Sequence, residues 1–119
     1  MSTGTNPIIA NQAKGLTPFA LVPGLGRVVN TFAIVGPSAT NEITRTITGF
    51  QLSTAEPATI LLQPRQSNNH DLGYHDVFAV QVVETAIDRI KIHIKRLDSA
   101  GGWGQNLRVD ILIIDQMNN

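Results

Sequence analysis

The sequence predicts an all-β protein, and two alternating segments near the C-terminus are the main reason. In residues 89–95, isoleucines at positions 90, 92 and 94 alternate with basic side chains. In residues 107–113, aliphatic side chains again occupy every second position. A period of two places successive side chains on opposite faces of the chain, which is typical of a half-buried β-strand. The glycine-rich connection, residues 98–106, suits a turn between two strands.

The other strands follow from β-rich runs bounded by turn residues. Gly36 and Pro37 end the first run, β-branched side chains fill the second, and Pro64 is expected to stop the third. A polar stretch, residues 65–75, is expected to be a long loop. The short, regular spacing is typical of sandwiches and barrels. The expected strands are residues 27–35, 42–50, 58–63, 77–84, 87–97 and 107–115.

The alternation also predicts the core and a second, partly covered apolar face. If the last two strands pair, the favoured register sets Ile94 opposite Ile111 and Lys95 opposite Asp110, because a shift of one residue would invert a whole face. Leu112 and Ile114 then lie on the second face, which predicts that the arm or another subunit covers them. The expected core residues are Ile43, Ile47, Ile60, Leu62, Val80, Val82, Ile90, Ile92, Ile94, Val109, Ile111 and Ile113.

Residues 1–26 are predicted to form an extended N-terminal arm, separate from a sandwich domain of residues 27–119. Proline and glycine interrupt any regular pattern in the arm, and residues 1–41 contain Lys14 and Arg27 but no acidic residue. The segment is nevertheless too apolar for an ordinary solvated linker. It is expected either to lie on another protein or to fold back over its own sheet, and both would bury the same side chains. These partner-binding candidates are Ile8, Ile9, Leu16, Phe19, Leu21, Val22 and Leu25.

Length and composition narrow the function classes. The 119 residues are enough for one domain, and the absence of cysteine excludes disulfides and thiolate metal sites. Nine basic and nine acidic residues cancel, which argues against nucleic-acid binding. The N-terminus lacks the pattern of a signal peptide, and no apolar run approaches the 18 residues of a membrane span.

No motif predicts catalysis, a cofactor or a bound metal. His70-Asp71 and His75-Asp76 repeat a pair of metal-ligand types, but no third ligand is specified, so a hydrogen-bonded polar loop is the favoured interpretation. Ser67 has histidine and aspartate nearby but no nucleophile turn around it. Residues 24–26, Gly-Leu-Gly, lack the third glycine and the helix of a dinucleotide loop.

Two further features have alternative interpretations. Trp103, between two glycines, is expected either to cap the open end of the sandwich or to sit at a loop tip and contact a sugar or partner. Arg89, Lys91 and Lys95 form a basic row that would suit an acidic partner. Acidic residues at positions 84, 88 and 110 are close enough in sequence or predicted register to neutralise this row instead.

The stretch RLDSAGGWG, residues 96–104, followed by an alternating apolar strand, resembles the last hairpin of H-type-lectin-like domains. It more closely resembles small virion proteins of tailed bacteriophages that end in similar strands. The resemblance spans about residues 42–115. It implies a six-stranded antiparallel sandwich that forms trimers, with N-acetylgalactosamine-type sugars bound at subunit boundaries in the lectins. The N-terminal arm has no lectin counterpart but suits capsid-decoration (cement) proteins, whose arms reach over neighbouring capsid subunits.

These observations together lead to an expectation for function. The chain is expected to be a noncatalytic structural component of a phage particle, a capsid-decoration protein made in the host cytoplasm and located on the virion surface. Its expected partners are the major capsid protein and other copies of itself, as a homotrimer, without nucleic acid, membrane or cofactor. The alternative is a lectin-like carbohydrate-binding module on a phage tail or baseplate.

Overall fold

A computed structural model describes residues 7–10, 20–24, 26–57, 59–66 and 76–115, and this part of the chain is all-β. Its ten strands are β1 (Ile8–Ile9), β2 (Ala20–Val22), β3 (Gly26–Val35), β4 (Ser38–Thr40), β5 (Glu42–Thr48), β6 (Thr59–Gln66), β7 (Phe78–Ala86), β8 (Arg89–Arg96), β9 (Gly101–Trp103) and β10 (Leu107–Ile114).

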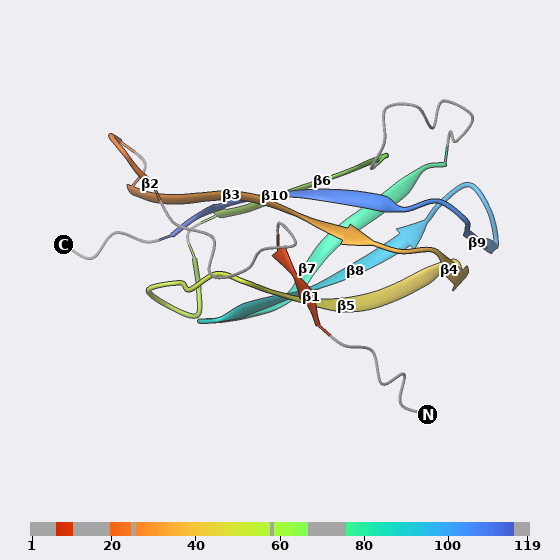
Figure 1. Cartoon of the computed structure of the whole chain (residues 1–119), viewed down its shortest axis with the longest axis horizontal. Coiled ribbons are helices and arrows are strands. Elements are labelled where there is room, and N and C mark those ends of the chain that lie inside the picture. Colours follow the sequence, from red (N-terminus) through yellow and green to blue (C-terminus); the bar gives the residue numbers. More distant parts are fainter. Residues whose placement is uncertain (1–6, 11–19, 25, 58, 67–75, 116–119) are drawn as a thin grey trace.

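The strands form three sheets, an arrangement compatible with a β-sandwich. Sheet A has the order β1-β5-β8-β7, sheet B the order β2-β3-β10-β6, and the small sheet C pairs β4 with β9. Sheets A and B lie one above the other, and sheet C lies at one end of the pair (Figure 1). All pairings are antiparallel except that of β1 with β5, which is parallel.

The hydrophobic core lies between sheets A and B because each long strand turns every second side chain inward. In β8 the three isoleucines are fully buried, and in β10 the residues at 107, 109, 111 and 113 are buried while their neighbours are half-exposed. All twelve residues expected in the core are either buried or packed against the buried cluster. The core prediction is therefore confirmed. Additional buried side chains come from Ala10, Val29, Ala33, Val35, Phe50, Leu52, Trp103 and Leu107.

The last two long strands do not pair with each other, so the register expected for that pairing does not occur. β8 pairs with β5 and β7 in sheet A, whereas β10 pairs with β3 and β6 in sheet B. Ile111 lies opposite Thr31 and Leu62, and Lys95 lies opposite Glu42 and Ala79. Two strands with one apolar face each can bury those faces equally well side by side in one sheet or face to face across a core. Alternation alone could therefore not distinguish these two arrangements.

The six predicted strands are all present with shifted ends, but the count of six is not confirmed, because four short strands accompany them. One boundary was misjudged for a clear physical reason. Proline lacks an N–H, so Pro64 was expected to end its strand, yet β6 continues through it. β6 is the last strand of sheet B, and an edge strand needs hydrogen bonds on one side only.

The described parts of the first 26 residues belong to both sheets. β1 adds to the edge of sheet A, with Ile8 opposite Ile47, and β2 adds to the edge of sheet B, with Ala20 opposite Val28. Ala10 is fully buried. Gly49 has φ +105°, and a β-carbon there would lie 3.0 Å from the Ala10 nitrogen, so this close approach requires glycine. Residues 7–10 and 20–22 therefore lie against sheets of the same chain. This corresponds to the alternative in which the arm folds back over its own sheet.

Candidate functional site

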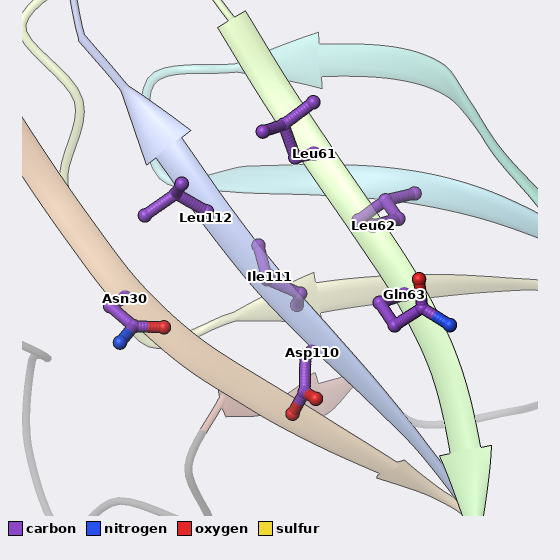
Figure 2. A pocket seen from close by; sticks show the side chains of 7 residues that line it. All are labelled: Asn30, Leu61, Leu62, Gln63, Asp110, Ile111 and Leu112. Carbon is purple, nitrogen blue, oxygen red and sulfur yellow. The ribbon is translucent and has the colours of Figure 1, made fainter.

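The outer face of sheet B contains an apolar hollow of about 380 Å³ (Figure 2). Its apolar lining comes from Leu61 and Leu62 of β6 and from Ile111 and Leu112 of β10, and Leu61 is 56% exposed. The side chains of Asn30, Gln63 and Asp110 lie around these leucines. The hollow crosses three neighbouring strands, since Leu112 lies opposite both Asn30 and Leu61 in the sheet.

The charges beside the hollow are paired with one another. The Asp110 carboxylate accepts hydrogen bonds of 2.7 Å from the Nε of Arg65 and from the Nε of Arg108. The Arg108 guanidinium also lies 3.9 Å above the centre of the Phe32 ring. A carboxylate held by two guanidinium groups attracts further cations weakly. An uncharged partner can therefore approach the hollow without leaving a charge unpaired.

Leu112 and Ile114 lie on the outer face of sheet B, opposite the core, as the alternation indicates, and both are half-buried. Ile114 lies between Val28 of β3 and Thr59 of β6. Whether another molecule covers these two residues stays a prediction.

The arm candidates fall into three groups. Ile8 packs against the core, and Val22 is half-buried. Ile9 is 50% exposed and Leu21 is 78% exposed, so strand pairing holds their backbone while their side chains face solvent. Leu16, Phe19 and Leu25 lie outside the described residues.

Trp103 lies in strand β9 and is only 4% exposed, so it is not displayed at a loop tip. Its ring meets Phe78 edge to face, with 5.0 Å between ring centres and 86° between ring planes. The register of sheet C places it opposite Ser38. This location closes one end of the core, which is the arrangement that the capping alternative describes.

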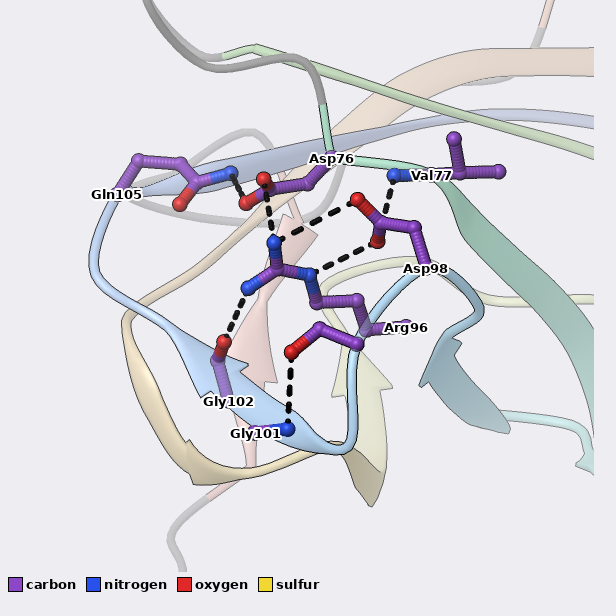
Figure 3. Close-up of polar contacts among 8 residues, drawn as sticks. Asp76, Val77, Arg96, Asp98, Gly101, Gly102 and Gln105 are labelled. Atoms are coloured by element: carbon purple, nitrogen blue, oxygen red, sulfur yellow. Dashed lines mark hydrogen bonds and ion pairs between the residues drawn. The ribbon is translucent and has the colours of Figure 1, made fainter.

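A polar cluster surrounds Arg96 at the same end of the fold (Figure 3). The Arg96 guanidinium donates to Asp76 and to Asp98, each at 2.9 Å, and to the carbonyl oxygen of Gly102. Gln105, which is almost fully buried, donates from Nε2 to Asp76 at 2.7 Å. The cluster joins the ends of β7, β8 and β9, so its geometry indicates a structural role. Sequence reasoning missed it, because Asp76 precedes Arg96 by 20 residues in the chain. The other members follow Arg96 closely, but only the turns after β8 bring them to its guanidinium.

The cluster shifts the pKa of both charged groups at its centre. The hydrogen bond from Arg96, and a second from the Val77 amide at 3.2 Å, hold the pKa of Asp98 below its ordinary value. The hydrogen bond to Asp98 raises the pKa of Arg96, which is protonated at any physiological pH. Hydrogen bonds to the ionised form of a carboxyl favour that form.

Folding stability is expected to depend on Asp98 in the acid range. A carboxyl whose folded pKa is depressed stabilises the fold fully above its unfolded pKa, about 3.9, and loses that contribution as pH falls through the folded pKa. Urea unfolding midpoints at pH 7 and pH 3 should therefore differ less in Asp98→Asn than in the wild type. Asp88→Asn, which removes an equal charge at the other end of β8, is the control. Equal pH dependence in Asp98→Asn and the wild type would contradict the assignment.

The basic row on β8 is neutralised within the chain. Lys91 lies 3.2 Å from Glu84, Arg89 lies 2.9 Å from Asp88, and Lys95 lies 3.8 Å from a Glu42 oxygen. Glu84 and Asp88 thus neutralise the basic row as expected. Asp110 does not, because it lies on sheet B, and Glu42 lies beside Lys95 instead. These exposed pairs contribute little to stability.

The remaining sequence candidates are only partly described. Ser67, His70, Asp71 and His75 lie outside the described residues, and Asp76 belongs to the Arg96 cluster. Among residues that the structure describes, no group of three or more His, Cys, Asp or Glu side chains is placed to hold a metal ion. No helix within those residues is long and apolar enough to cross a membrane.

Comparisons with known proteins identify no relative. No protein-family model matches the chain, and neither a curated protein nor a solved structure matches it.

Proposed function

We propose that this protein is a noncatalytic structural component of a phage particle, a decoration protein of the capsid surface. One observation supports the proposal most directly. The two arm strands β1 and β2 are fastened by strand pairing to sheets A and B, yet they direct the apolar side chains of Ile9 and Leu21 to solvent. Apolar side chains on a backbone that is already ordered suit contacts with another protein, because little further ordering is needed on binding.

The fixed backbone matters for affinity. Ordering a free chain costs about 1–2 kcal/mol of backbone entropy per residue, whereas residues already in a sheet do not bear that cost on binding. Full burial of an isoleucine or leucine side chain contributes roughly 1.5–3 kcal/mol. The two arm strands are therefore more efficient contacts than a free tail of the same composition.

The wider proposal follows the resemblance described from the sequence. The chain acts as a six-stranded sandwich core with residues 1–26 as its contact arm, works as a homotrimer, and binds the major capsid protein on the outer surface of the virion. The lectin-like alternative requires an accessible aromatic side chain for sugar stacking. The burial of Trp103 leaves Tyr74, the single tyrosine, as its aromatic candidate.

Ile9→Thr is expected to weaken binding to capsids about tenfold, because threonine keeps the β-branched shape of the strand residue but loses apolar contact. The assay adds purified chain to heads of the encoding phage, stripped of decoration and separated from tails, and measures bound protein by sedimentation. Leu97→Ser, which alters an exposed leucine away from the arm, is the control and should bind as the wild type does.

Deleting residues 1–26 would be a poor test, because it removes buried Ala10 and two sheet strands.

The same preparation tests the lectin-like alternative when the wild-type chain is passed over immobilised N-acetylgalactosamine. Binding to the sugar without binding to heads would overturn the decoration proposal in favour of the lectin-like alternative. Equal binding of Ile9→Thr and wild type to heads would show that β1 of the arm is not part of the contact.

A further inference from the structure

We infer that copies of this chain associate head to tail, with Leu21 of one copy inserted into the hollow between Leu61 and Leu112 on sheet B of the next. The inference rests on the proposed function as an assembly protein, and it specifies the contact between subunits. It combines a projecting apolar side chain with an open apolar hollow, both of which the structure describes.

Leu21 is the projecting group. It is more exposed than any other large hydrophobic side chain among the described residues, at 78%. Its backbone is held by β2 pairing, in register with Arg27 of β3, so the side chain has a defined position. Residues 20–24 carry no charge, and Ala20 at the start of β2 and Pro23 just after the strand are both exposed. The cross-strand neighbour Arg27 is already paired with Asp115 at 3.0 Å, so Leu21 can enter an apolar site without leaving a charge unpaired.

Leu21 cannot fill the hollow of its own chain. Residues directly opposite each other in neighbouring antiparallel strands point to the same face of the sheet. Leu21 lies opposite Arg27, which shares its face with buried Val29, whereas the hollow lies on the face of exposed Asn30. Leu21 thus projects on the side of sheet B opposite the hollow, and only a second molecule can bring the two together.

The hollow is suited to a neutral apolar group. Its volume of about 380 Å³ is lined by the exposed side of Leu61 and by Leu112, with the amides of Asn30 and Gln63 close by to bond a partner's backbone. The Asp110 carboxylate next to it is already satisfied by two arginines. The chain as a whole has a formal net charge of zero, so two copies approach without net repulsion.

The predicted symmetry follows from the two patches being different. A contact between two different patches is heterologous, so each copy retains one free patch after pairing, and further copies add until a ring closes. A self-complementary contact would instead stop at a dimer. This difference makes the inference testable by mixing variants.

Leu21→Glu and Leu61→Glu are each expected to weaken self-association at least about tenfold in sedimentation, because each places a charge in the contact. An equal mixture of the two variants should form dimers, since the Leu61→Glu chain still offers Leu21 and the Leu21→Glu chain still offers an intact hollow. Urea unfolding of each variant checks that both remain folded. Leu97→Glu, at a leucine with the same 56% exposure as Leu61, should associate as the wild type does.

Crosslinking then locates the contact. The chain has no native cysteine, so Leu21→Cys mixed with Leu61→Cys should form an interchain disulfide on mild oxidation. Each variant alone should stay uncrosslinked, as should Leu21→Cys mixed with Leu97→Cys.

Three results would each overturn the inference: a monomeric wild type, no dimer in the mixture of the two Glu variants, or disulfides between identical positions. A wild-type chain that binds heads but does not self-associate would reject this contact alone, whereas self-association without head binding would reject the decoration role alone.

Discussion

Trp103→Ala is expected to lower the free energy of unfolding by about 3–5 kcal/mol, the usual cost of truncating a large buried aromatic side chain. The indole is almost fully buried at one end of the core and packs edge to face on Phe78, so its removal leaves a cavity and an aromatic ring without its partner. The neighbouring strands can collapse only partly, because sheet C and the Arg96 cluster hold that end of the fold. Urea denaturation followed by circular dichroism measures the loss.

Trp103→Phe is the matched variant for this experiment. The Nε1 of Trp103 has no hydrogen-bond partner within the described part of the chain, so phenylalanine sacrifices volume but no such bond. Its expected loss is therefore smaller than that of alanine. If Trp103→Ala unfolds at the wild-type urea concentration while binding to heads or sugar falls, the residue is a binding anchor and the capping assignment is wrong.

Gly102→Ala is expected to destabilise the protein by roughly 1–3 kcal/mol or more, the range for side chains forced into filled space. A β-carbon at this position would lie 1.8 Å from the Ser38 carbonyl oxygen and 2.8 Å from the Ala39 carbonyl carbon. Both obstacles are backbone atoms, so strands β4 and β9 must separate to make room. The shift would also disturb the neighbouring Trp103 and the hydrogen bond from Arg96 to the Gly102 carbonyl.

Gly104→Ala provides the control, because a β-carbon there meets nothing within 4 Å. The two variants add the same methyl group two residues apart, and thermal or urea unfolding compares them directly. A similar stability for both variants would show that β4 and β9 are not held as closely as the structure indicates.

The long strands and the core could be predicted because they depend on local pattern. Alternation in β8 and β10 is set by the pleat of a single strand, which turns each second side chain to the same face whatever its neighbours are. Every expected core residue accordingly lies in or against the buried cluster. The same reasoning placed Leu112 and Ile114 on the opposite face correctly, although the register used to argue it was wrong.

The candidate contact surfaces were only half predictable. Composition identified Ile9 and Leu21 as apolar residues of a segment without acidic residues, but their exposure depends on which edge strands β1 and β2 join. The hollow could not be anticipated from residues 61–63, because it forms only where β3, β10 and β6 lie side by side. Trp103 likewise had two alternative positions in the sequence analysis, capping or loop tip, until sheet C set its direction.

The amino-acid sequence by itself determined the strand class, the inward-facing positions and the apolar, acid-free character of the first segment, since these depend on side-chain chemistry and a period of two. Only the tertiary structure decided that β8 and β10 face each other across the core rather than pair, that β1 and β2 attach to opposite sheets, and that Arg96 gathers Asp76, Asp98 and Gly102. The physical reason is that apolar strands gain similar burial from several partners. The choice among those partners depends on how all the strands can pair at once.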